Sequence, residues 1–78
     1  MAIDLTKKSN SVVIKWINIH SNEYGYVKDV NRADKHFENT FDKAEARVYG
    51  NKGSATSVVK TLVSYGEGEN NIFEIVPA

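Results

Sequence analysis

Few residues in this 78-residue chain have types and spacing suited to catalysis or metal binding. There is no cysteine, and His20 and His36 are the only histidines. Asp34, His36 and Glu38 alternate, so an extended strand would place three metal-binding groups on one side. A zinc site of this kind needs a fourth ligand and supporting contacts, and a solvent-facing helix accounts for the same residues. We therefore expect no metal, no cofactor and no enzymatic activity.

Two glycine-containing segments could in principle hold a phosphate group. Such a loop offers bare backbone amides at the start of a helix. In the segment Gly66-Glu67-Gly68-Glu69, the two acids would repel phosphate and a strand is expected next, so we predict a connector. The segment Gly50-Asn51-Lys52-Gly53 is explained by the end of a helix.

The aromatic side chains near the N-terminus give the clearest functional signal. We predict that partner binding is carried by Trp16, Tyr24, Tyr26, Lys28 and His20. Trp and Tyr are enriched among the residues that dominate protein interfaces. Rings beside lysines could instead stack on the bases of a single strand of nucleic acid. A third interpretation is that the rings fill the second side of a thin sheet or a homodimer contact.

The charge balance argues against nucleic acid as the main partner. Ten Lys and Arg residues balance ten Asp and Glu residues, for a formal net charge of zero. A nucleic-acid-binding surface is usually basic, so we expect this alternative to be the weaker one. The sequence contains no apolar run of the ~18 residues that span a membrane, and it opens without a secretory signal. We expect a cytoplasmic protein with no membrane partner.

The first predicted element is a β-hairpin over residues 12–30, because β-branched and aromatic residues dominate both halves. A three-residue loop at Ser21–Glu23 would place Lys15 opposite Asp29, whereas a two-residue turn would place it opposite Lys28. Opposite charges across a strand pair are favourable, so we prefer the longer loop. In that register the core face has Val13, Ile17, Ile19 and Val27. The other face has Ile14, Trp16, Asn18, His20, Tyr24, Tyr26, Lys28 and Val30.

Residues 31–50 are predicted to be helical, as one helix or as two. Asn31 could cap the first segment, and Asp42 with Glu45 has the form of a capping box. The residues expected to pack on the sheet are Phe37, Phe41, Ala44 and Val48.

Residues 56–77 are predicted to be a second hairpin, because β-branched residues crowd the stretch before Gly66 and residues 72–76 have the pattern of a strand. A helical stripe at Ala55, Val58, Val59, Leu62 and Val63 is the alternative. The predicted fold is therefore α+β, with a small antiparallel sheet of two hairpins (12–30 and 56–77) packed on one or two helices (31–50). Residues 1–10 are expected to be a flexible arm, and residues 11–78 a single domain.

The order of several short segments looks like that of small uncharacterised phage and prophage proteins. The matching segments are Val12-Val13-Ile14-Lys15-Trp16, Gly25-Tyr26-Val27, Ala33 with Phe37, and Phe41-Asp42-Lys43-Ala44-Glu45-Ala46. This resemblance covers about residues 11–65 and assigns no functional residues. It implies a non-enzymatic inhibitor or adaptor that occupies a surface of a host enzyme or defence complex in the host cytoplasm, for example an anti-CRISPR-like inhibitor.

Overall fold

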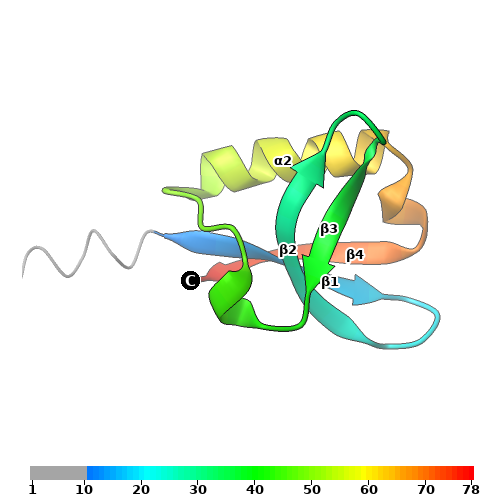
Figure 1. Cartoon of the computed structure of the whole chain (residues 1–78), viewed down its shortest axis with the longest axis horizontal. Coiled ribbons are helices and arrows are strands. Elements are labelled where there is room, and N and C mark those ends of the chain that lie inside the picture. Colours follow the sequence, from blue (N-terminus) through cyan, green and yellow to red (C-terminus); the bar gives the residue numbers. More distant parts are fainter. Residues whose placement is uncertain (1–10) are drawn as a thin grey trace, which may run out of the picture.

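A four-stranded antiparallel sheet carries a long helix across one face (Figure 1). The computed structural model describes residues 11–78, and the predicted arm at 1–10 lies outside them. In chain order the elements are β1 (Val12–Asn18), β2 (Tyr24–Asn31), β3 (His36–Thr40), η1 (Lys43–Glu45), α2 (Lys52–Ser64), η2 (Glu67–Glu69) and β4 (Asn71–Pro77). The strands lie in the order β3-β2-β1-β4. The predicted α+β class is confirmed, but its elements occupy different residues.

The first hairpin forms as predicted, in a different register. Lys15 lies opposite Tyr26, not Asp29, and the connecting loop is longer than expected. Asn18 explains the loop: its side-chain oxygen accepts hydrogen bonds from the backbone N–H groups of His20 and Ser21. Its backbone N–H donates to the carbonyl of Glu23 over 2.8 Å. Asn22 takes the left-handed conformation, with φ 63°, which asparagine tolerates better than most residues.

The new register changes which side chains form the core. Ile14 and Trp16, predicted for the exposed face, belong to the buried cluster. Val13 and Val27 are buried as predicted, whereas Ile17 is half-buried and Ile19 is 48% exposed. The physical reason is the position of α2, which packs on the side of β1 that carries the even-numbered residues. A face of a sheet becomes the core only where another element covers it.

The predicted helix over 31–50 is wrong, since this stretch holds β3 and one 3-10 turn. Asn31 does accept a hydrogen bond from the N–H of Asp34, over 3.0 Å. That bond closes a tight turn between β2 and β3, with Lys35 at φ 58°, and starts no helix. Phe37 packs against the core from a strand, whereas Phe41, Ala44 and Val48 are exposed.

Asp42 caps only the three-residue turn η1, in which its carboxylate accepts from the N–H of Ala44. Helix growth stops there because the following backbone bonds to the sheet. The N–H of Arg47 donates to the carbonyl of Val27, and Tyr49 forms a two-bond bridge with Val12. These bonds also bring the Tyr49 ring into the core.

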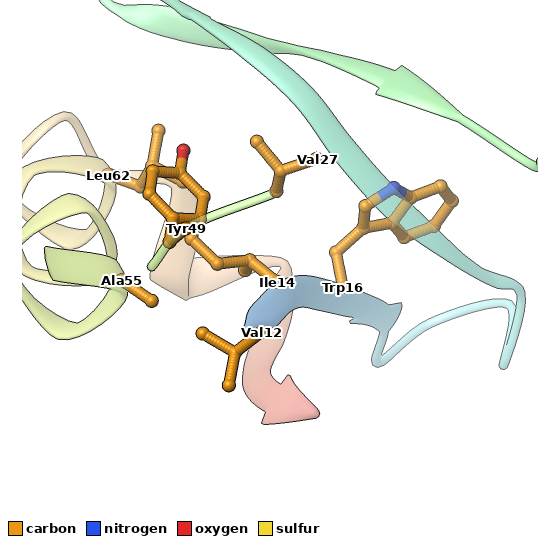
Figure 2. Packing of buried hydrophobic residues seen from close by; sticks show 7 residues of the cluster. All are labelled: Val12, Ile14, Trp16, Val27, Tyr49, Ala55 and Leu62. Carbon is orange, nitrogen blue, oxygen red and sulfur yellow. The ribbon is translucent and has the colours of Figure 1, made fainter. Parts of the chain in front are cut away.

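The helix lies at 52–64, where the second hairpin was predicted. Asn51 caps it by accepting from the N–H of Ser54 over 2.8 Å, and Gly66 follows its end at φ 92°. Ala55 and Leu62 are fully buried, so the periodicity indicated the correct structure and the β-branched content did not. The predicted strand at 72–76 is confirmed as β4, which pairs with β1. Figure 2 shows Ala55 and Leu62 facing the β1 side chains across the core.

Candidate functional site

The sheet face opposite α2 carries a mixed apolar and charged surface. We call it the open face and define it by Lys15, Ile17, Tyr24, Tyr26, Ile72 and Glu74. Strand alternation turns Lys15 and Ile17 away from the core-facing Ile14 and Trp16. Tyr26 and Glu74 flank Lys15 on the neighbouring strands, and Tyr24 and Ile72 flank Ile17 in the same way. Directly opposite residues of antiparallel strands share a face, so three strands contribute to this surface.

Two large side chains of the open face are more than half exposed. Tyr24 is 56% exposed and Ile72 is 53% exposed. The Lys15 ammonium lies 4.6 Å from the centroid of the Tyr24 ring, a cation–π contact. Lys15 is thereby held over the aromatic end of the surface, with Glu74 opposite it on β4. The face can offer a partner an apolar patch with one cation and one carboxylate beside it.

Trp16 does not belong to this surface, so its prediction as an exposed side chain is wrong. It is only 5% exposed and lies on the helix side of the sheet. Its cross-strand neighbour is Gly25, and its indole Nε1–H donates to the carbonyl of Tyr26 over 3.2 Å. A Cβ on Gly25 would lie 2.7 Å from an indole carbon, so the missing side chain makes room for the ring. Figure 2 shows the indole over β2.

The other predicted partner-binding residues fall into three places. Tyr24 and Tyr26 lie together on the open face. His20 lies in the β1–β2 loop, where its Nε2 is 3.1 Å from the side-chain oxygen of Asn70, and it is exposed. Lys28 is exposed at the irregularity in the β2–β3 pairing between Val27 and Asp29. Their role in partner binding stays a prediction.

Sequence reasoning missed four members of the open face: Lys15, Ile17, Ile72 and Glu74. Ile72 and Glu74 alternate with the core-facing Phe73 and Ile75. This alternation indicated that Ile72 and Glu74 lie on the strand face that points away from the core. Their place beside β1 depends on the pairing of β1 with β4, which are separated by most of the chain.

No cluster suited to a metal forms within residues 11–78. Asp34 lies in a turn and His36 begins β3, so the alternating triplet is not on one strand. His36 Nε2 is 3.8 Å from the Asp34 carboxylate, and both side chains are well exposed. The core residue Tyr49 has a perturbed phenol: burial raises its pKa, and the nearby Arg47 opposes this rise.

Comparisons with protein-family models, with curated proteins and with solved structures returned no match for this chain. In the part of the chain that the structure describes, no helix is both long and apolar enough to cross a membrane. The functional proposal is therefore based on the open face.

Proposed function

We propose that this protein is a non-enzymatic protein-binding module that uses its open face. The observation that carries this proposal is the exposure of Tyr24 and Ile72 on either side of the half-buried Ile17. Apolar side chains that lie together on a surface gain free energy when a partner removes them from water. Tyr is also among the residues that most often dominate the binding energy of interfaces.

The partner that fits this surface is a protein with an apolar patch and charges of both signs near it. Lys15 and Glu74 give the open face one positive and one negative group at its centre. Such a pair favours one orientation of a partner without demanding a strongly charged one. On the resemblance to phage proteins, we propose a host enzyme or defence complex as the partner, and a role as an inhibitor or adaptor that occupies its surface.

The contact between Lys15 and Tyr24 makes single-stranded nucleic acid a weaker candidate. The ammonium occupies one face of the Tyr24 ring, and base stacking would need such a ring face. The balanced net charge adds no general attraction for phosphate. A homodimer through the same face is the other alternative, and both are outcomes of the experiments below.

The test compares capture of proteins from a lysate of the natural host cell by three forms of the tagged protein. The double variant Tyr24→Ser/Ile72→Ser removes the apolar part of the open face. The control Val63→Ser changes a side chain of α2 that is 53% exposed. We expect a defined protein to be retained by the wild type and the control and lost with the double variant. Equal retention by all three forms would contradict the proposal.

Two further measurements separate the alternatives. Sedimentation equilibrium of the purified protein tests self-association, which would appear as a mass that rises with concentration and falls in the double variant. A fluorescence titration with a single-stranded oligonucleotide at low salt tests nucleic-acid binding, which would weaken steeply as salt is added. Either result, with no host protein retained, would replace the proposal.

A further inference from the structure

A hollow of about 350 Å³ opens on the helix side of the sheet, near the sheet end to which the β1–β2 loop connects. We call it the aromatic hollow. Its walls come from β1, β3, the start of β4 and η2. The lining residues that bear on its chemistry are Trp16, Phe37, Phe41, Glu23, Glu67 and Asn39. It lies on the other side of the sheet from the open face, so the inference is independent of the proposed function.

Three aromatic rings form one side of the aromatic hollow. Phe41 meets Trp16 edge-on, with ring centroids 5.7 Å apart, and Phe37 lies 6.5 Å from Trp16. Trp16 is nearly buried, whereas Phe41 is 69% exposed. An exposed phenylalanine contributes little to the core, yet this one stands beside a concave surface. Its free ring carries the negative quadrupole that attracts cations.

Acidic side chains outnumber basic ones in the lining of the aromatic hollow. Glu23 and Glu67 are among its lining residues, and no lysine or arginine is. The one basic lining residue, His36, has its Nε2 3.8 Å from the carboxylate of Asp34. Among residues 11–78, neither glutamate forms an ion pair with Lys, Arg or His. The remaining lining groups, such as Asn39, are mainly amides, whose carbonyl oxygens accept hydrogen bonds. The two glutamates would repel an anion. A purely apolar group would displace water from the polar lining groups without replacing their hydrogen bonds.

An arginine side chain matches this combination. Its planar guanidinium stacks on aromatic faces, donates several hydrogen bonds in one plane and pairs with carboxylates. We propose that the aromatic hollow binds the guanidinium group of an arginine side chain from a partner polypeptide, stacked on Phe41 and paired with Glu23 and Glu67. A lysine ammonium would satisfy the charge but lacks the planar stacking surface.

The experiment uses Trp16, the only tryptophan, as a reporter inside the aromatic hollow. The purified protein is titrated with N-acetyl-arginine methylamide while tryptophan fluorescence and the backbone amide NMR shifts are recorded. The lysine and citrulline analogues serve as probes with the same backbone. We expect a saturable change for the arginine probe, localised to the lining residues. The lysine probe should bind more weakly, and the neutral citrulline probe should bind weakest.

Variants with matched controls test the two contacts separately. Phe41→Ala should weaken arginine binding about two- to fivefold, the range of a cation–π contact at an exposed site. Val48→Ala, at a side chain that is 57% exposed and outside the lining, should leave it unchanged. Glu67→Gln should also weaken binding about two- to fivefold, whereas Glu69→Gln, in the same turn but outside the lining, should not. Because Phe41 and Glu69 are exposed, we expect their substitution to leave the midpoint of thermal unfolding unchanged. Thermal unfolding of all the variants is the check that they fold.

Three results would overturn the proposal. One is the absence of a saturable change up to the solubility limit of the arginine probe. Another is binding of the citrulline or lysine probe at least as tight as that of the arginine probe. The third is an unchanged affinity in both Phe41→Ala and Glu67→Gln, which would place any binding elsewhere on the molecule.

Discussion

The two faces of this sheet differ sharply in what their aromatic residues do. On the helix side, Trp16 is 5% exposed, covers Gly25 and donates its indole hydrogen to a backbone carbonyl. On the open face, Tyr24 is 56% exposed and the Lys15 ammonium lies over its ring. Both are large aromatic residues of the same hairpin. Their roles differ because a helix covers one face and the described residues place none over the other.

This contrast shows that residue type alone does not identify a binding surface. Trp is the more typical hot-spot residue of the two, yet here it is committed to the fold. The neighbouring Gly25 contributes to this, since it leaves a space on β2 that the indole fills. The residues left for binding are those whose cross-strand neighbours also point away from α2.

Truncation of the two aromatic side chains gives the largest expected contrast. Trp16→Ala should lower the free energy of unfolding by about 3–5 kcal/mol, because it empties part of the core. Tyr24→Ala should lower it by less than about 1 kcal/mol, as expected of a surface substitution. Urea unfolding followed by far-UV circular dichroism measures both, since this signal does not depend on tryptophan. Similar losses in the two variants would mean that the faces are not distinct.

A side chain at Gly25 tests why the indole lies where it does. A Cβ there would stand 2.7 Å from both the backbone oxygen of Thr40 and the Trp16 ring. Gly25→Ala should therefore destabilise the fold by about 1–3 kcal/mol, the usual cost of overpacking. Gly50→Ala is the control, because the space around that glycine is open. Equal unfolding midpoints in urea for the two variants would contradict this account of the helix-side packing.

The helix that covers one face depends on its N-cap. Asn51→Ala removes the side-chain bond to the N–H of Ser54 and should cost about 0.5–2 kcal/mol. We expect hydrogen exchange to quicken in α2 and at the core-facing strands, while binding through the open face is unchanged. Loss of binding in this variant at temperatures where it remains folded would show that the two faces are coupled.

The smallest expected effect concerns Tyr49, the core tyrosine on the helix side. Burial raises the pKa of its phenol above the unfolded value of about 10. When folding raises the pKa of an acid, the contribution of that acid to the free energy of unfolding is fully present below its unfolded pKa. This contribution is lost as the pH rises through its folded pKa. Tyr49→Phe should therefore lose less stability than the wild type between about pH 9 and pH 11. Urea unfolding at each pH measures the free energy of unfolding of both proteins. A parallel decrease of this free energy in the two proteins would contradict this assignment.

Local sequence signals correctly predicted three of the four expected strands and several turn contacts. The runs of β-branched and aromatic residues identified β1, β2 and the strand at 72–76, and Asn31 and Asp42 do cap turns. Those signals could not decide which element comes after each cap. The bond from Asn31 to the N–H of Asp34 suits a helix start and a hairpin turn equally well, and only the pairing of β3 with β2 selects the turn.

The helix at 52–64 shows a conflict between two sequence signals. Its β-branched residues favoured a strand, while the spacing of Ala55, Val58, Val59 and Leu62 favoured a helix. The hydroxyls of Ser57 and Thr61 bond to carbonyls four residues earlier, which accommodates them in the helix. Burial of Ala55 and Leu62 against the sheet then outweighs the weak intrinsic preference of the β-branched residues for a strand.

The sequence by itself determined the α+β class, the first hairpin and the aromatic character of its surface. Propensity and turn chemistry act between near neighbours, so they can be read along the chain. Only the tertiary structure decided which face is buried, because that depends on the pairing of β1 with β4 and on the side where α2 packs. A shift of one residue in strand register exchanges the two faces. Because α2 packs on the side of β1 that carries Ile14 and Trp16, Trp16 became part of the core. Lys15, Ile17 and Ile72 joined Tyr24 on the open face.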